Sequence, residues 1–263
     1  MTQKAIIEKI NEHKKQPNLR YILKEKTEAF TKDLFYTLFD IDTEVAKNLD
    51  RLESQFDALV DLACWDVDKS CKKIWTSYVE KLPEILRRLN LDAEATVNCD
   101  PASQSIEEVY MAYPGFYAIA IYRLAHELYK EGFPLVPRLM TECAHRQTGI
   151  DINPGAQIGD SFHIDHGTGI VIGETAIVKN HVKIYQGVTL GGLYVAKHLH
   201  KTKRHPTIED NVTIYASATI LGGDTVIGEN SVIGGNAWLT DSVPKNSTVF
   251  HTPEIKIKPL SNA

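Results

Sequence analysis

Hydrophobic residues recur about every six positions between Ile152 and Val249, and this repeat organises the second half of the chain. A period of six matches neither the roughly 3.6-residue period of a helix nor the alternation of a strand. It is typical of a solenoid in which three short strands form each coil and one aliphatic side chain per strand points inward. An ordinary sandwich would instead show period-two alternation and turns about every 8–12 residues. The repeating positions are Ile152, Ile158, Ile164, Ile172, Val178, Ile184, Leu190, Ile208, Ile214, Leu221, Ile227, Ile233 and Leu239.

Two irregularities interrupt this repeat. The step from Ile164 to Ile172 is eight residues, which predicts a bulge or a wider corner at residues 165–169. The period is lost between Leu190 and Ile208, so residues 191–206 should leave the coils as a loop. Insertions of this kind often carry the function of a solenoid. Glycine, asparagine and aspartate recur between these positions, as turns with positive φ require.

The first half of the chain is predicted to be helical. Residues 43–82 carry apolar side chains at helical spacing, and residues 116–129 form a second, strongly apolar helix. Ser105 and Glu108 form a capping box, which predicts that a helix begins at this point.

Two segments before residue 105 are predicted to interrupt the helices. Pro83 should permit only one more short helix, which ends near Leu89. The polar segment 91–104 contains Asp100-Pro101 and should be a loop.

The pattern therefore predicts an α+β protein with three parts. A helical domain should span residues 1–148, and a parallel β-helix with an extruded loop should span residues 149–249. Residues 250–263 should form a C-terminal tail.

Composition narrows the class of partner and compartment. The chain has 263 residues, is 43% hydrophobic and carries a net charge of −5, which favours neither nucleic acid nor an anionic membrane as partner. It contains no apolar run of about 20 residues and no apolar signal core near the N-terminus. The four cysteines show no metal-like spacing, so we expect a cytoplasmic protein without a bound metal.

Three charged clusters lie at breaks in the repeat. Asp151 stands where the coils begin, Asp165-His166 lies at the wide corner, and Arg204-His205 ends the loop. A carboxylate bonded to one imidazole nitrogen fixes the tautomer and supports the cation that forms when the other nitrogen accepts a proton. Such a pair can deprotonate a hydroxyl nucleophile. Sequence alone leaves it open whether Asp151 stacks beside His166.

Several strings in this region resemble the serine O-acetyltransferases, a family of hexapeptide-repeat acyltransferases. The likeness covers residues 99–244 densely and implies that the β-helix is left-handed. The strings that carry it are Asp100-Pro-Ala102, Gly149-Ile-Asp-Ile-Asn-Pro154, Ile164-Asp-His-Gly-Thr-Gly169, Ile172-Gly-Glu-Thr-Ala176, Gln186-Gly-Val-Thr-Leu-Gly-Gly192 and Arg204-His-Pro-Thr-Ile208.

The resemblance implies transfer of an acetyl group from acetyl-CoA to the hydroxyl of L-serine, a step in cysteine biosynthesis. His166 would be the general base and Asp151 its dyad partner. Arg204 and His205 would hold the substrate carboxylate, which suits the affinity of arginine for carboxylates.

Two further carboxylates would meet the substrate ammonium group, namely Asp100 and Asp165. L-Cysteine would bind in the same pocket and inhibit the enzyme.

The resemblance also suggests where acetyl-CoA binds. Gly191 and Gly192 would let it approach the backbone, and Ala216 and Gly234 would line a groove between neighbouring subunits. None of the clusters contains a cysteine or serine placed as an acyl carrier, so direct attack of the hydroxyl on the thioester is the better interpretation.

The same resemblance also implies an oligomeric state and bears on one protein partner. Family members form trimers through the β-helix and join two trimers through the N-terminal helices, which implies a trimer or a homohexamer. The family tail often ends in isoleucine, which inserts into O-acetylserine sulfhydrylase. This chain ends in Leu260-Ser-Asn-Ala263, so we do not expect a stable complex with that enzyme.

Three alternatives remain open at this stage. The chain could acylate a sugar, an antibiotic or another amino acid, or its helices could serve mainly as an oligomeric scaffold. It could also be a metalloenzyme like a γ-type carbonic anhydrase, which needs three converging histidines. The candidates for that role are His163, His166, His181 and His205.

Overall fold

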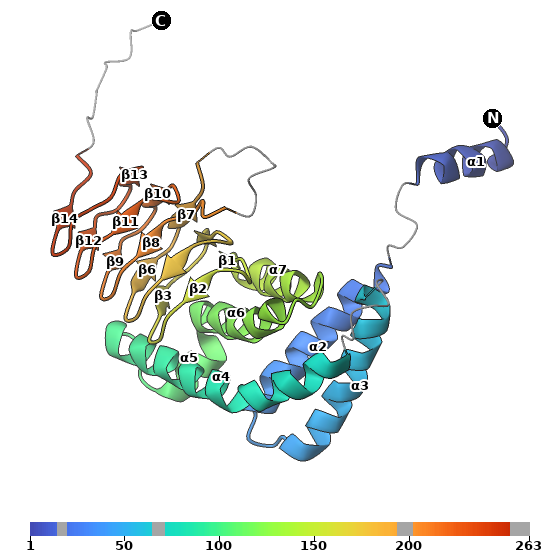
Figure 1. Ribbon diagram of the computed structural model, residues 1–263. Coiled ribbons are helices and arrows are strands. Elements are labelled where there is room, and N and C mark those ends of the chain that lie inside the picture. Colours follow the sequence, from blue (N-terminus) through green and yellow to red (C-terminus); the bar gives the residue numbers. More distant parts are fainter. Residues whose placement is uncertain (15–19, 65–71, 194–201, 253–263) are drawn as a thin grey trace, which may run out of the picture.

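The structure is a computed structural model that describes residues 1–14, 20–64, 72–193 and 202–252. Helices occupy the first half and a stack of short strands the second, with the strands rising away from the helices (Figure 1). The helices are α1 (Gln3–His13), α2 (Ile22–Phe39), α3 (Val45–Ala63), α4 (Lys72–Cys99), α5 (Ile106–Ala112), α6 (Pro114–Lys130) and α7 (Val136–Thr148).

Local chemistry accounts for several helix ends. Ser105 caps α5 by accepting a hydrogen bond of 3.2 Å from the backbone N–H of Glu108, which confirms the predicted capping box. Gly149 ends α7 in the left-handed conformation, with φ of 72°, and leads directly into the first strand. The chain thus passes from α7, which ends at Thr148, to the first strand of the β-helix, which begins at Asp151.

Helix α4 corrects two predictions. Pro83 lies inside a continuous helix of 28 residues, and residues 91–99 are helical rather than part of a loop. The physical reason is burial, because one face of α4 packs Leu89 and Ala93 into the core. Asp92 is also fully buried on this helix, so a residue that suggests a loop in the sequence faces a partner in the fold.

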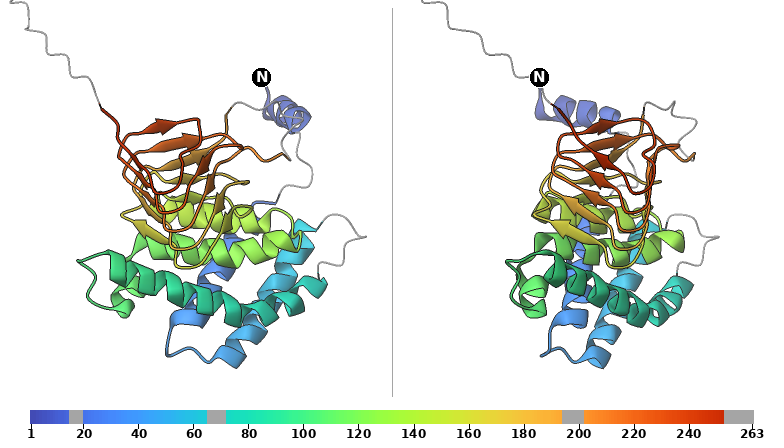
Figure 2. Two further views of the ribbon diagram at one scale, coloured as in Figure 1. Left: turned by 60° about the vertical axis from the view of Figure 1, so that its left-hand side comes forward. Right: turned by 90° about the vertical axis from the view of Figure 1, so that its left-hand side faces the viewer.

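The strands form a parallel β-helix with three sheets (Figure 2). Sheet A contains β1, β4, β7, β10 and β13, sheet B contains β2, β5, β8 and β11, and sheet C contains β3, β6, β9, β12 and β14. The left hand of the coils stays a prediction from the family resemblance. The strand bounds are β1 (Asp151–Ile152), β2 (Gln157–Ile158), β3 (His163–Asp165), β4 (Val171–Ile172), β5 (Ile177–Val178), β6 (Lys183–Tyr185), β7 (Thr189–Gly191), β8 (Thr207–Ile208), β9 (Thr213–Ile214), β10 (Thr219–Leu221), β11 (Val226–Ile227), β12 (Val232–Ile233), β13 (Trp238–Leu239) and β14 (Thr248–Val249).

The predicted aliphatic series lines the inside of the coils, with one correction. Ile220, rather than Leu221, is the fully buried residue of β10, and it pairs in register with Leu190. The series therefore keeps its step of six from Ile214 to Ile220, and the extra residue falls between Ile220 and Ile227. Gly222, with φ of 105°, lies in that wider turn.

The helical half packs against the first coil. Helices α4 and α6 both contact β3, and the Tyr122 hydroxyl of α6 donates a hydrogen bond of 2.6 Å to the carbonyl of Ala156. Gly115 lies so close to Ile164 that a Cβ there would overlap the Ile164 carbonyl oxygen. This close approach sets the start of α6 beside the wide corner that follows β3.

A buried ion pair fixes the same junction. The Asp92 carboxylate accepts hydrogen bonds of 2.5 and 2.8 Å from the Arg123 guanidinium and one of 2.9 Å from the backbone N–H of Phe162. Arg123 also donates to the carbonyls of Ile158 and Gly159. The pair therefore ties α4 and α6 to the turn between β2 and β3.

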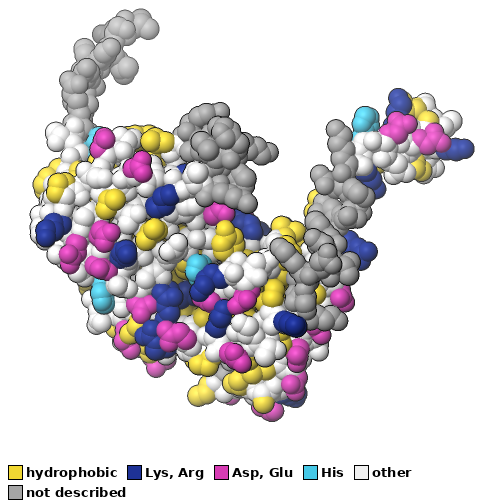
Figure 3. Space-filling view, in the orientation of Figure 1, with side chains coloured by type: hydrophobic (Ala, Val, Ile, Leu, Met, Phe, Trp, Pro, Cys, Tyr) yellow, Lys and Arg dark blue, Asp and Glu magenta, His cyan; other side chains and the backbone are white. Residues whose placement is uncertain are grey.

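More exposed charges surround this junction. Lys and Arg side chains gather with Asp and Glu where the helices meet the lower coils (Figure 3). Between α4 and the turn after β2, Arg87 and Arg88 both pair with Asp160. These groups are partly solvated, so we expect each pair to contribute little to the free energy of unfolding.

Two observations bear on the compartment. No described helix is long and apolar enough to cross a membrane. Cys64 is disulfide-bonded, whereas Cys99 and Cys143 are free thiols. A cytoplasmic location stays a prediction.

Candidate functional site

The corner that follows β3 presents His166 to solvent. His166, Gly167 and Gly169 all have positive φ, so the eight-residue step forms the predicted wide corner. A Cβ on Gly167 would overlap the Ile150 side chain, so only glycine fits there. The His166 side chain is 74% exposed, and its Nε2 lies 3.8 Å from the Asp165 carboxylate. The imidazole is therefore free to meet a ligand at this corner.

Asp100 comes to the same corner from the end of α4. Its carboxylate accepts hydrogen bonds of 2.8 Å from the backbone N–H of Ala102 and 2.7 Å from the Tyr113 hydroxyl. These two bonds lower the pKa of Asp100, and nearby His163 and His166 lower it further. Asp100, Asp165 and His166 thus form one polar group, which we call the His166 cluster.

Asp151 has a different partner from the expected one. Its carboxylate binds the Arg138 guanidinium of α7, with Oδ1 3.0 Å from Nη1, and Arg138 also pairs with Glu142. Among the described residues, no hydrogen bond or ion pair joins Asp151 to His166. The dyad stays a prediction, and any bond between the two side chains would compete with Arg138.

A second polar group, the His205 cluster, lies where the chain enters β8. Strand β8 pairs with β5, and extending this register by two residues sets His205 beside Thr175. The backbone N–H of Thr175 donates a hydrogen bond of 3.0 Å to His205 Nδ1. Arg204 pairs with Glu174, which also accepts a hydrogen bond of 3.0 Å from the Tyr129 hydroxyl.

Burial lowers the pKa of His205 to about 4, and the positive charges of Arg204 and Lys203 add to this effect. The imidazole is therefore neutral at physiological pH. Its ring lies against Gly173, where a Cβ would overlap it.

The two clusters lie at opposite ends of β4. His166 and Gly169 precede this strand, and Gly173 and Thr175 follow it. The four steps from Gly169 to Gly173 span about 13 Å at the usual rise of a strand. One chain therefore does not bring His166 and His205 into a single pocket.

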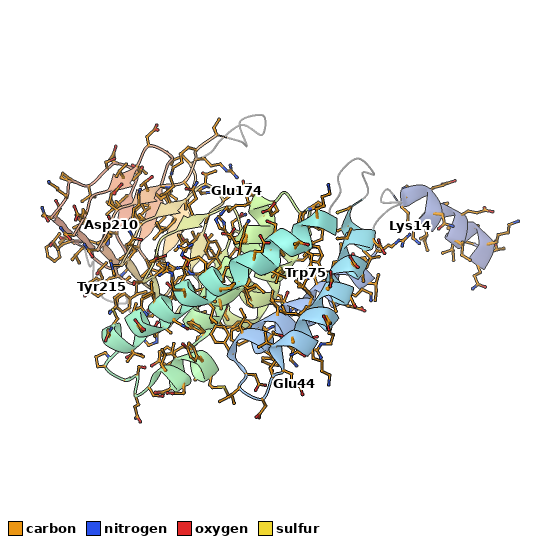
Figure 4. The ribbon with its side chains drawn as sticks, turned by 60° about the horizontal axis from the view of Figure 1, so that its bottom comes forward. Lys14, Glu44, Trp75, Glu174, Asp210 and Tyr215 are labelled. Carbon is orange, nitrogen blue, oxygen red and sulfur yellow. The ribbon has the colours of Figure 1, made fainter. Side chains whose placement is uncertain are left out.

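Figure 4 labels Glu174, which belongs to the His205 cluster, and Tyr215. The two residues lie well apart on the coils. Tyr215 stacks on Tyr185 with ring centroids 4.9 Å apart, and Tyr185 pairs in register with Asp165. The aromatic pair thus continues the edge that carries the His166 cluster.

The residues expected to bind acetyl-CoA also fall into two groups, one near each cluster. Gly191 ends β7 and Gly192 lies against the backbone of Arg204, so both belong with the His205 cluster. Extending the register of β3, β6 and β9 places Ala216 two coils away from the corner that carries His166. Gly234 follows β12 on the same edge of sheet C.

Comparison with known proteins supports the family resemblance of the sequence motifs. No protein-family model matches the chain. A curated serine acetyltransferase from Synechococcus elongatus is 49% identical over 188 residues, which cover 70% of this chain and 59% of that protein. One from Helicobacter pylori is 44% identical over 128 residues, which cover 49% of this chain and 72% of that protein. The chain belongs to the serine acetyltransferase family.

Solved serine acetyltransferases share its fold. Isoform 3 from Entamoeba histolytica, in complex with cysteine, has a TM-score of 0.77 and 33% identity over 90% of this chain and 84% of its own. The Brucella abortus enzyme, in complex with coenzyme A, has a TM-score of 0.65 and 31% identity over 86% of this chain and 80% of its own. The Neisseria gonorrhoeae enzyme, in complex with serine, has a TM-score of 0.64 and 28% identity over 88% of this chain and 94% of its own.

This member of the serine acetyltransferase family spans only part of some curated relatives. The matched segments cover 59%, 51% and 52% of the first three of them.

The geometry does not support the metalloenzyme alternative. Among the described residues, the only group of three possible ligands is Glu142, His145 and Asp151, and Arg138 already pairs with two of them. None of the four histidines considered from the sequence belongs to this group.

His163 is one of those histidines, and it is buried. Its Nδ1 lies 3.0 Å from the Thr96 hydroxyl, and its Nε2 is buried with no hydrogen-bond partner among the described residues. Burial lowers the pKa of His163 to about 4. We therefore assign it to the packing of α4 on β3.

The sequence did not reveal the residues that hold the site residues in place. Tyr113 fixes Asp100, Arg138 binds Asp151, and Thr175 binds His205. Tyr113 and Arg138 lie outside the repeats, so their spacing carried no signal, although Thr175 lies within a string that resembles the family.

Proposed function

We propose that the protein is a serine O-acetyltransferase, which transfers the acetyl group of acetyl-CoA to the hydroxyl of L-serine. The products are O-acetylserine and CoA, and L-cysteine inhibits by binding in the serine pocket. The observation that supports this best is the His166 cluster, in which an exposed imidazole lies 3.8 Å from the Asp165 carboxylate and is near enough to Asp100 to help lower the pKa of that carboxyl. A β-hydroxy amino acid needs a base that accepts the proton of its hydroxyl, which His166 would supply. It also needs anions that bind its ammonium group, which Asp100 and Asp165 would supply.

The mechanism follows from these groups. His166 accepts the proton of the serine hydroxyl while the hydroxyl oxygen attacks the thioester carbon, and the C–S bond then breaks. The same proton can pass to the departing CoA thiolate, so the charges balance without a covalent acyl-enzyme. Asp151 is the proposed partner that supports the imidazolium, and this role requires it to share its carboxylate between His166 and Arg138.

The site is proposed to be complete only between two subunits. The corner that carries the His166 cluster of one chain would face the corner that carries the His205 cluster of its neighbour. Gly191 and Gly192 of the neighbour would then face Ala216 and Gly234 across the acetyl-CoA groove. A trimer through the β-helix gives each subunit one such interface, and pairing of two trimers through the helices gives a hexamer.

Mixing two inactive variants tests the shared site. We expect His166→Ala and His205→Ala to be nearly inactive alone. Co-refolded at a one-to-one ratio, they should regain about a quarter of wild-type activity, because random assembly restores both clusters at about one interface in four. Activity is measured as L-serine-dependent thioester loss. Mixed trimers, verified by mass, that stay inactive would show that each site belongs to one chain.

Gly173 offers a second test, because it leaves room for the His205 ring. Gly173→Ala should push this ring away and raise the KM for L-serine at least about tenfold, since a small misplacement of a binding group is costly. Steady-state kinetics measures the effect, and thermal unfolding checks that the coils remain folded. A folded variant with an unchanged KM would contradict the assigned role of His205.

The function itself is tested with purified protein. Acetyl-CoA thioester loss should require L-serine, and L-cysteine should inhibit it competitively with L-serine. Absence of turnover with L-serine, combined with turnover on a sugar, an antibiotic or another amino acid, would identify a different acyltransferase.

Three expectations stay predictions. The chain should work in the cytoplasm, without a bound metal and without a stable complex with O-acetylserine sulfhydrylase. The tail on which the last expectation depends, residues 253–263, lies outside the described residues.

A further inference from the structure

Thr175 makes four hydrogen bonds to the segment that contains His205. Its backbone N–H lies 3.0 Å from His205 Nδ1, and its hydroxyl oxygen lies 2.8 Å from the same nitrogen. The hydroxyl oxygen also accepts hydrogen bonds from the backbone N–H groups of Arg204, at 2.9 Å, and His205, at 3.1 Å. One residue thus holds both the backbone and the ring of His205.

These bonds fix the position of the ring proton. A backbone N–H can only donate, so His205 Nδ1 must accept and cannot carry a proton. The Thr175 oxygen already accepts two N–H groups, which leaves its own proton to point at Nδ1. A neutral imidazole with a bare Nδ1 carries its proton on Nε2.

The surroundings keep the ring in this neutral form. Burial is the largest cause that holds the pKa of His205 near 4, and Arg204 and Lys203 act in the same direction. The Glu174 carboxylate acts in the opposite direction and raises the pKa of His205, but it already pairs with Arg204 and accepts a hydrogen bond from Tyr129.

We propose that Thr175 fixes His205 as a neutral imidazole with its proton on Nε2, so that His205 donates a hydrogen bond to the substrate carboxylate. The proposal rests on the proposed function, in which Arg204 and His205 bind this carboxylate. Among the described residues, His205 Nε2 has no hydrogen-bond partner. A bond from this N–H to a carboxylate is charge-assisted and therefore strong.

The two histidines of the composite site would then have separate roles. His166 has no hydrogen bond from a neighbouring backbone N–H among the described residues and can accept a proton. His205 cannot act as a base, because protonation of Nδ1 would break two bonds to Thr175. Thr175 is a positioning residue, since it acts on the substrate only through His205.

The first experiment determines the tautomer directly in the full-length protein. Histidine is labelled with ¹⁵N, and His205→Gln assigns the signals of ring 205 in magic-angle-spinning spectra of sedimented protein. We expect a bare Nδ1 and a protonated Nε2 at about pH 7.5 and at about pH 5.5. A protonated Nδ1 at either pH would overturn the proposal, whatever acceptor the enzyme uses.

The second experiment compares two variants of Thr175. Thr175→Val removes the hydroxyl at nearly constant volume, and Thr175→Ser retains it. We expect the valine variant to raise the KM for L-serine about tenfold and to change kcat less than about threefold, because it loosens a contact present before and during reaction. The serine variant should stay within about twofold of wild type.

An acceptor without a carboxylate separates positioning from general damage. Serinamide should show the same KM with wild type and Thr175→Val. An equal rise for serinamide and L-serine would mean that Thr175 only supports the fold, which would overturn the proposal. If wild type acetylates neither compound, the proposed function fails, and the tautomer measurement still decides the state of His205.

Discussion

Replacing His166 by alanine should lower kcat for acetylation of L-serine by about 10²–10⁴-fold, the usual contribution of a general base. The side chain is 74% exposed and lies beside Asp165, so its removal leaves no buried cavity. Binding of acetyl-CoA should stay within about twofold, because the residues proposed for its groove are unchanged. Single-turnover kinetics and acetyl-CoA titration measure the two effects separately.

His181 supplies a matched control for this variant. It is an exposed histidine with φ of 57°, nearly the same as the φ of 56° at His166, and it lies at another corner of the coils. His181→Ala therefore tests the backbone effect of the substitution without touching the proposed site, and we expect wild-type activity. A folded His166→Ala protein with more than about a tenth of wild-type kcat would exclude His166 as the base.

The repeat made most of the β-helix predictable. Each strand from β1 to β12 buries one aliphatic side chain, so the sequence spacing marks nearly every strand. It failed at β10, where Ile220 and Leu221 are both aliphatic and adjacent. Only pairing decides between them, because Ile220 faces Leu190 in the coil below and Leu239 in the coil above.

The helical half was less predictable because polar residues face its interior. Asp92 and Thr96 make residues 91–99 look like a loop, yet both are buried. Their partners, Arg123 and His163, are far away in the sequence. No local rule identifies such pairs, so the continuous helix α4 could not be predicted from the segment alone.

The candidate site was predictable as a set of motifs but not as an arrangement. The sequence singled out His166 and His205, and the structure sets them at opposite ends of β4. Their separation depends on which corner each motif occupies in a three-sided coil. Asp151 shows the same limit, because its closest charged partner is Arg138, which lies in α7 outside the repeats and so has no spacing that links it to Asp151.

Arg123→Met should lower the free energy of unfolding by about 3–5 kcal/mol, the usual cost of leaving one buried charge without its partner. The Asp92 side chain is 0% exposed and that of Arg123 is 3% exposed, so water cannot replace the lost guanidinium. Burial already raises the pKa of Asp92, and Arg123 is the largest influence that opposes this rise. Urea unfolding at about pH 7, fitted with a common slope, measures the loss.

Two comparisons separate burial from charge in this test. Arg87→Met removes a guanidinium that is 52% exposed and pairs with Glu84 and Asp160, so we expect a loss of at most about 1 kcal/mol. Adding Asp92→Leu to Arg123→Met removes both buried charges and should recover part of the lost stability. The backbone N–H of Phe162 and the carbonyls of Ile158 and Gly159 still lose their bonds to these side chains. If Arg123→Met alone is as stable as wild type, the Asp92–Arg123 pair does not hold the junction.

The same variant should also affect the site. Asp92 and Asp100 lie on one helical segment, because α4 extends to Cys99 and the backbone N–H of Asp100 still bonds to the carbonyl of Thr96. Loosening Asp92 therefore shifts the end of α4 that brings Asp100 to His166. We expect folded Arg123→Met to raise the KM for L-serine while binding of acetyl-CoA stays unchanged, because Asp100, which is proposed to meet the ammonium group, is the residue expected to move. Arg87→Met should leave both constants unchanged.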